Sequence, residues 1–163
     1  YDHPRNISDD LLRKVAADGG VIQINALGAY IEDLEPPAER VEAMQALSEE
    51  FSGISPFDLS SNERERYLAR RQEINETYPM PLSSFEVFMD QMLHALAIVG
   101  PDHVGMGADW DGGGGVAGME DVSDLPKVTE RLLEEGYSKE DLEKIWGGNL
   151  LRIMRQAEAA KQN

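Results

Sequence analysis

The sequence predicts an α/β protein in which amphipathic helices alternate with short parallel strands. Residues 21–25 (VIQIN) and 103–107 (HVGMG) are short apolar segments typical of buried strands. Each follows a segment with helical periodicity and a turn that contains glycine. Because helix, short turn and strand recur in this order, we expect parallel βα units.

The first helix is expected to begin near residue 6 or 8 and to end at a glycine turn. Asn6 or Ser8 is placed to cap it, and the sequence Asp-Gly-Gly at 18–20 ends it. Its apolar residues recur at helical spacing: Leu11, Leu12 and Val15. The strand at 21–25 follows at once, which completes one unit of helix, tight turn and strand.

A long polar and strongly charged segment, about residues 32–81, separates the two strands. Helical periodicity is present at 41–51 and again at 62–77. Ser60 and Glu63 have the spacing of a capping box, in which each side chain bonds the backbone N–H of the other residue. We therefore expect a helical insertion on the surface, between the two strands.

A core-facing helix is predicted to precede the second strand. Ser83 is interpreted as its cap, with Glu86 three residues later, and Gly-Pro-Asp at 100–102 ends it. One face is apolar at helical spacing: Phe85, Phe88, Met89, Met92, Leu93 and Leu96. In the strand that follows, Gly105 and Gly107 indicate a close backbone approach inside a crowded sheet.

The chain contains only two predicted strands, which are too few to close a sheet by themselves. After a glycine-rich loop at 112–118, helices are expected near 125–135, 139–146 and 149–160. Ser138 with Asp141 marks the start of one of them. A (β/α)8 barrel takes about 250 residues. We therefore interpret residues 1–163 as the C-terminal part of a single barrel domain that carries the helical insertion.

Composition excludes several classes of protein. The net charge of −16, from 31 acidic and 15 basic residues, would repel a nucleic-acid backbone. Without cysteine, the chain has no disulfide, thiolate metal site or cysteine nucleophile. No apolar stretch approaches the roughly 18 residues of a membrane helix, so a soluble protein is expected. The start at Tyr1 fits a piece of a longer or processed protein, which leaves the compartment open, cytoplasmic or exported.

Asp109 and Asp111 follow directly on the second predicted strand. Catalytic groups of parallel α/β proteins lie at the C-terminal ends of strands, where the loops converge. The alternative is that two aspartates beside glycines form an Asx turn. A calcium loop does not fit the pattern, because position 113 lacks an oxygen ligand. A phosphate loop and a dinucleotide fingerprint also fail, because neither Lys-Ser nor the third glycine is present.

None of the three histidines is paired with another at the spacing of metal ligands. His94 lies within a predicted helix and His103 opens a strand at the face opposite the chemistry, so both are interpreted as structural. Near His3, the guanidinium of Arg5 is able to bind a carboxylate through two hydrogen bonds. Tyr30 lies just beyond the first strand, on the same face as Asp109, as a pocket wall or as a core tyrosine.

Four stretches together resemble one known family. These are residues 2–9 (DHPRNISD), 104–112 (VGMGADWDG), 118–124 (GMEDVSD) and 147–152 (GGNLLR). In order and spacing they are similar to the C-terminal part of the membrane (renal) dipeptidase family, peptidase family M19. The resemblance covers nearly the whole chain apart from residues 32–81.

This resemblance implies an amidohydrolase-type (β/α)8 barrel with two zinc ions. Such an enzyme hydrolyses dipeptides, including some with a D-residue at the C-terminal position, by a metal-bound hydroxide. By motif match, Arg5 resembles the arginine that binds substrate. Asp109 resembles the aspartate that contacts the substrate amine and shuttles a proton to the leaving group. Tyr30 falls where the family has a pocket tyrosine.

The family's zinc ligands, a His-x-Asp pair, a glutamate and two further histidines, have no match in this chain. We expect them in a preceding part of the same barrel, which would be this chain's partner, so this chain alone should bind no catalytic zinc and hydrolyse nothing. The long insertion and the absence of an anchor signal resemble bacterial members. A homodimer is a further partner hypothesis.

Two other functions stay open at this point. One keeps the barrel but changes the reaction, to hydrolysis of a lactone or a cyclic amide. The other is a non-catalytic, acidic helical module that binds a partner through the apolar face between Phe85 and Leu96.

Overall fold

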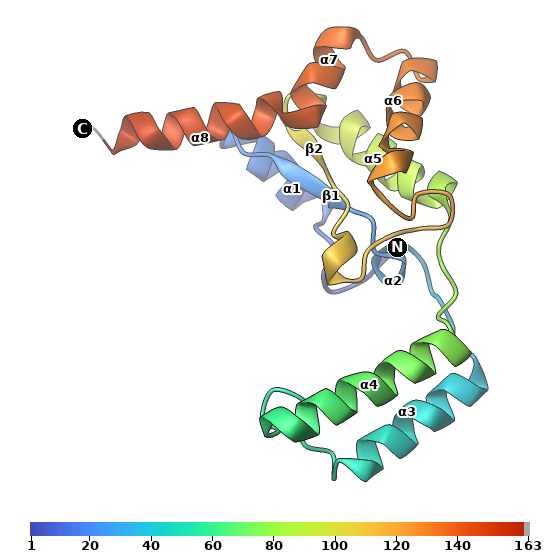
Figure 1. The fold of residues 1–163 in the computed structure, drawn as a ribbon. Coiled ribbons are helices and arrows are strands. Elements are labelled where there is room, and N and C mark those ends of the chain that lie inside the picture. Colours follow the sequence, from blue (N-terminus) through green and yellow to red (C-terminus); the bar gives the residue numbers. More distant parts are fainter. Residues whose placement is uncertain (162–163) are drawn as a thin grey trace. The chain divides into compact units, whose positions relative to one another are not determined.

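The computed structural model describes residues 1–161 and contains two compact units (Figure 1). One unit combines Tyr1–Asp33 with Leu82–Asn163, and the other is Leu34–Pro81. The first unit holds the sheet and the sites discussed below. The second is a pair of helices with a core of its own.

The sheet of the first unit consists of two parallel strands, β1 (Ile22–Asn25) and β2 (Val104–Gly107). Ile22 pairs with Val104 and Asn25 with Gly107, so the strands are in register from end to end. The helices α1 (Asp9–Ala17) and α5 (Phe85–Val99) precede them. The predicted parallel βα arrangement is confirmed, with β2 beginning one residue later than expected.

The two faces of this sheet differ in character. Four side chains of one face pack into the hydrophobic core: Ile22, Ile24, Val104 and Met106. Gln23, Asn25 and the two glycines of β2 alternate with them and occupy the other face. A Cβ on Gly105 would lie 2.6 Å from the Gln23 side-chain oxygen. The close approach predicted for these glycines is therefore real, but at Gly105 a side chain makes it, not a backbone.

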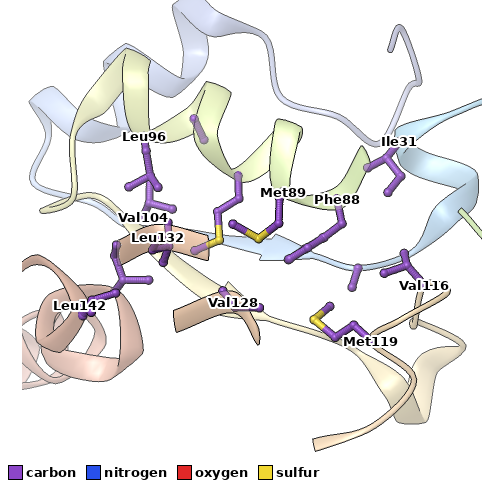
Figure 2. Packing of buried hydrophobic residues seen from close by; sticks show 14 of the residues in the cluster. Ile31, Phe88, Met89, Leu96, Val104, Val116, Met119, Val128, Leu132 and Leu142 are labelled. Atoms are coloured by element: carbon purple, nitrogen blue, oxygen red, sulfur yellow. The ribbon is translucent and has the colours of Figure 1, made fainter. Parts of the chain in front are cut away.

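Helix α5 is the central element of the core. Its residues Phe88, Met89 and Met92 have no solvent exposure. Figure 2 shows Phe88 and Met89 facing residues from β2 and from the C-terminal segments, among them Val104, Val116, Met119, Val128 and Leu132, and Met92 belongs to the same cluster. Burying such side chains contributes roughly 1.5–3 kcal/mol each. The face predicted for partner binding is therefore already covered, and the hypothesis of an interaction module that uses it is wrong.

Serine caps begin both helices that precede the strands. The Ser8 hydroxyl accepts a hydrogen bond from the Leu11 N–H at 3.4 Å, which selects Ser8 over Asn6 as the cap of α1. In α5 the cap is Ser84, whose hydroxyl accepts from the Val87 N–H at 3.3 Å. The assignment of Ser83 was wrong by one residue, because its backbone carbonyl accepts from Ala117 at 2.7 Å and its side chain is buried.

Three helices form the C-terminal part of this unit. They are α6 (Leu125–Glu134), after a 3-10 turn at Val122–Asp124, then α7 (Lys139–Glu143) and α8 (Asn149–Ala160). The Ser138 and Asp141 capping box is present as predicted. The helix expected to reach residue 146 ends earlier. A π-helical turn follows at Lys144–Gly148, and within it Gly147 has non-helical backbone angles.

The start of α8 is fastened to the amino-terminal ends of the strands. Asn149 is buried and donates to the carbonyls of Pro101 at 2.7 Å and Val104 at 2.9 Å. Arg152 donates to the carbonyls of Gly19 at 2.8 Å and Asp102 at 2.9 Å. These bonds give the sequence motif at 147–152 a structural role, on the edge of the sheet opposite Asp109.

The second unit consists of α3 (Ala38–Glu50) and α4 (Ser61–Thr77). Both predicted helices are present, and the Ser60 and Glu63 capping box is confirmed. A small core joins them: Leu47, Phe51, Leu59 and Ile74. The rings of Phe51 and Tyr67 meet edge to face at 5.4 Å. Among residues 1–161, no helix is long and apolar enough to cross a membrane.

Candidate active site at the carboxyl ends of the strands

Asp109 lies two residues beyond β2, in a tight turn with left-handed backbone geometry (φ 59°, ψ 36°). Its carbonyl accepts hydrogen bonds from the N–H groups of Gly112 at 3.0 Å and Gly114 at 2.8 Å. A left-handed residue other than glycine costs about 1–2 kcal/mol, which aspartate tolerates better than most residues. These two bonds therefore hold Asp109 in a conformation that it would otherwise leave.

The carboxylate of Asp109 is held on one side only. The Asn25 side-chain amide, at the end of the neighbouring strand, donates to Oδ2 at 3.1 Å. Within residues 1–161, Oδ1 has no hydrogen-bond partner, and the carboxylate caps no backbone N–H of the turn. A simple Asx turn would use this carboxylate, so that alternative does not describe the site. One carboxylate oxygen is left available for a ligand.

The two residues after Asp109, Trp110 and Asp111, differ in their contacts. Trp110–Gly112 forms one 3-10 turn, and the half-buried Trp110 indole donates to the Met119 carbonyl at 3.4 Å. Asp111 is exposed and makes no side-chain hydrogen bond in the part of the chain that the structure describes. The two aspartates thus differ, and only Asp109 contacts the end of β1.

Arg5 and Tyr30 are brought together by a stack of side chains. Tyr30 belongs to a single helical turn, α2 (Gly28–Ile31), directly after β1. The Arg5 guanidinium carbon lies 5.4 Å from the centre of the Tyr30 ring, and the His3 ring lies 4.8 Å from it. Asn6 fixes the backbone here by donating to the Tyr30 carbonyl at 2.6 Å.

Arg5 has no carboxylate partner among residues 1–161. Its guanidinium rests on an aromatic face, an arrangement worth about 0.5–1 kcal/mol at an exposed site. The fork of hydrogen-bond donors therefore stays free to bind an anionic group.

A cavity of about 360 Å³ lies next to this stack, and Arg5, Asn25 and Tyr30 are among its lining residues. All four residues of β1 line it, from both faces of the strand, together with Leu12 of α1 and His94 of α5. The cavity therefore follows the unpaired edge of β1. Asp109 does not line it, so we do not assign this cavity to a substrate.

The histidines make structural contacts in the described residues. His94 Nε2 lies 2.8 Å from the Asp9 carboxylate and ties α5 to α1. His103 Nδ1 lies 2.8 Å from the Gly20 carbonyl, at the amino-terminal edge of the sheet. Within residues 1–161 no three histidine, aspartate or glutamate side chains gather to hold a metal ion. The residues present therefore do not fit a pair of zinc ions.

A lysine organises the acidic loop between the glycine-rich segment and α6. Lys127 donates to the Gly118 carbonyl at 2.8 Å and to the Asp124 carboxylate at 2.6 Å. The hydrogen bond from Lys127 lowers the pKa of Asp124 below its ordinary value. The pKa of Asp121 is lowered as well, by hydrogen bonds from Ser123. The motif at 118–124 thus holds its own loop in shape.

Asn25 and Gly112 contribute to the site, and the sequence interpretation missed both. The available signal for Asn25 was its place as the polar last residue of a β-branched strand, at the same sheet edge as Asp109. The signal for Gly112 was weaker, because it begins a run of four glycines that does not show which one is needed. A Cβ at Gly112 would lie 2.7 Å from the Asp109 carboxyl carbon.

Parallel strands with polar side chains gathered beyond their carboxyl ends are typical of the class of parallel α/β proteins that bind ligands at this edge of the sheet. The particular family follows from comparison with known proteins. The chain belongs to the membrane dipeptidase family, peptidase family M19, whose sequence profile matches residues 1–163.

Individual relatives agree with this assignment. Dipeptidase ataJ of Aspergillus terreus is 28% identical over 156 residues, which are 95% of this chain and 27% of that protein. Dipeptidase tcpJ of Claviceps purpurea is 42% identical over 77 residues, 47% of this chain and 18% of that protein. Human dipeptidase 3 is 37% identical over 82 residues, 50% of this chain and 17% of that protein.

A solved structure is similar as well. The crystal structure of the probable dipeptidase PvdM from Pseudomonas aeruginosa matches with a TM-score of 0.62 and 32% identity. The match covers 93% of this chain and 40% of that one. The chain thus spans between about a sixth and about a quarter of the length of the curated relatives named above, which range from 17% to 27%.

Proposed function

We propose that this chain is the C-terminal part of a (β/α)8-barrel dipeptidase, with about residues 32–81 inserted between the last two barrel strands. The observation that carries the proposal is the Asp109 carboxylate, fixed at the carboxyl end of β2 with one oxygen free. Catalytic groups of such barrels lie at this end of the strands. Family membership supplies the reaction class, hydrolysis of a dipeptide.

Several surfaces of the first unit support the barrel. In the part of the chain that the structure describes, the sheet has two strands only, so β1 and β2 each have one edge without a partner strand, and Gln23 and Asn25 are not among the residues of the hydrophobic core. On α8, Leu150, Leu151 and Met154 are about half exposed, at 48%, 48% and 52%. A two-stranded sheet is marginal in water by itself. Further βα units of a barrel would pair the edges and cover these side chains.

Charge complementarity supports a dipeptide as substrate. A free dipeptide carries an ammonium group at one end and a carboxylate at the other. In the proposal, the Asp109 carboxylate accepts hydrogen bonds from the ammonium group, takes the proton that the attacking water gives up as it adds to the peptide carbonyl, and passes that proton to the leaving amine as the C–N bond breaks. Arg5 binds the substrate carboxylate. Tyr30 supports the Arg5 guanidinium, and in the proposal it forms a wall of the substrate pocket that the complete barrel would enclose.

The resemblance to the family is the only support for zinc in this proposal. The resemblance implies two zinc ions, and the described residues do not fit them. We therefore place the ligands in other parts of the enzyme and assign this chain the handling of substrate and proton. Preference for a D-residue at the C-terminal position is part of the same family-based proposal.

Turnover of the complete, zinc-loaded enzyme on a panel of dipeptides, lactones and cyclic amides tests the function. The proposal expects hydrolysis of dipeptides, and kcat lowered about 100-fold or more by Asp109→Asn, because general acid–base groups typically contribute that much. Asp90→Asn is the matched control, since Asp90 is exposed on α5. Wild-type turnover by Asp109→Asn would refute the role of Asp109. A preference for lactones or cyclic amides would refute the dipeptidase.

A further inference from the structure

We propose that Asn25 is a positioning residue, which holds the Asp109 carboxylate in its working orientation and leaves one oxygen for the substrate. The inference rests on the proposed function of Asp109 and adds a residue to it. Asn25 acts through Asp109 and not on the substrate itself, so its effect should appear only while the Asp109 carboxylate is present.

The contact joins two parts of the chain that are far apart in sequence. Asn25 ends β1 and pairs with Gly107, two residues before Asp109. Its side-chain nitrogen lies 3.1 Å from Asp109 Oδ2. Because an ionised carboxylate only accepts hydrogen bonds, the NH₂ group of the amide must face Asp109. The orientation of Asn25 is thus fixed by chemistry, and its oxygen must point away from Asp109.

This orientation has a cost for folding. The side-chain oxygen of Asn25 is buried and has no hydrogen-bond partner among the described residues. An unpaired buried acceptor destabilises a folded protein, and buried polar groups are nearly always paired. A residue that served folding alone would more often be one that leaves no buried acceptor unpaired. The retained amide therefore indicates that its bond to Asp109 matters for the site.

Other contacts fix the backbone of Asp109 and leave its carboxylate to Asn25. The glycine N–H groups of the turn bind the Asp109 carbonyl, and Gly112 provides space for the side chain. Within residues 1–161, the Asn25 amide is the only hydrogen-bond donor to the carboxylate. Without it, the carboxyl group can rotate about its own bonds and lose the alignment of the free oxygen.

A double-mutant cycle in the complete enzyme tests the inference, with kcat and KM measured for Asn25→Ala, Asp109→Asn and the double variant. We expect Asn25→Ala to lower kcat about 10- to 100-fold, since misplacement by about 1 Å costs this much, with KM changed less than about threefold. In the Asp109→Asn background the same change should lower kcat by less than about twofold. Asn62→Ala, on the exposed surface of α4, is the matched control.

Asn25→Leu keeps the approximate shape of the side chain and removes its donor without adding a charge beside Asp109, and it should lower kcat like Asn25→Ala. Thermal melting of each variant shows whether it folds. If Asn25→Ala does not fold, the cycle is measured with the second Asn25 variant instead. Losses that multiply in the double variant, or unchanged kcat in both Asn25 variants, would overturn the positioning role. Full activity of Asp109→Asn would instead overturn the proposed function, so the two failures are distinguishable.

Discussion

Gly112→Ala is the substitution expected to disturb the site most directly without disturbing the fold. Gly112 has no left-handed backbone, so alanine is compatible with its conformation. The added Cβ would, however, lie 2.7 Å from the Asp109 carboxyl carbon and 2.8 Å from Oδ2. The whole carboxylate must then move, because the contact includes an atom close to the backbone as well as the end of the side chain.

The size of the effect follows from what the carboxylate loses. A side chain forced off its rotamer costs about 0.5–1.5 kcal/mol. The lost bond from Asn25 leaves a carboxylate that water can still solvate, so we expect the free energy of unfolding to fall by about 1–2 kcal/mol. Misplacement of a catalytic group by about 1 Å lowers kcat/KM about 100-fold, which equals about 2.7 kcal/mol of transition-state stabilisation.

Gly113→Ala separates the loss of activity from a loss of stability. Gly113 has a left-handed backbone (φ 96°), and its added Cβ would meet no atom within 4 Å. This variant should lose about 1–2 kcal/mol of stability and keep most of its activity. Dipeptide turnover and chemical denaturation of both variants are the assays. A folded Gly112→Ala enzyme with more than half of the wild-type kcat/KM would refute the placement of Asp109.

Three further predictions concern other parts of the chain. Asn149→Ala should lower the free energy of unfolding by about 2–4 kcal/mol in chemical denaturation, because two carbonyls lose their donor, whereas Asn62→Ala should change it little. Lys127→Gln should raise the pKa of Asp124 toward its ordinary value in an NMR titration. Because the folded pKa is lowered, the stabilisation that Asp124 provides is present at neutral pH, and the Tm difference between wild type and variant should vanish as the pH falls through that pKa. Arg5→Lys should raise KM for dipeptides about tenfold with little change in kcat, since lysine lacks the planar fork.

Short-range chemistry explains why much of the fold could be predicted from the sequence. The caps at Ser8, Ser60 and Ser138 bond groups within three residues, so the pattern contains all the partners. The alternation of helix and strand predicted the parallel pairing, because short connections between these elements allow few topologies. The family followed from motifs that hold loops in shape and fasten helices to strand ends.

The errors and omissions depend on contacts between distant segments. In sequence Ser83 is the better cap, because Glu86 follows at the spacing of a capping box, and the bond from Ala117 to the Ser83 carbonyl is what leaves the cap to Ser84. Asn25 and Asp109 are 84 residues apart, and only the register of β1 with β2 brings them together. No local pattern encodes that register, so the positioning of Asp109 had to come from the structure.

The most direct test of the central claim is a crystal structure of the complete enzyme with a phosphinate analogue of a dipeptide. The account predicts that the analogue's amine lies about 2.6–3.2 Å from the Asp109 carboxylate. Its carboxylate should meet the Arg5 guanidinium, and the bond from Asn25 to Asp109 should be retained. An analogue bound with its amine away from Asp109, or with its carboxylate held by other groups than Arg5, would contradict the account.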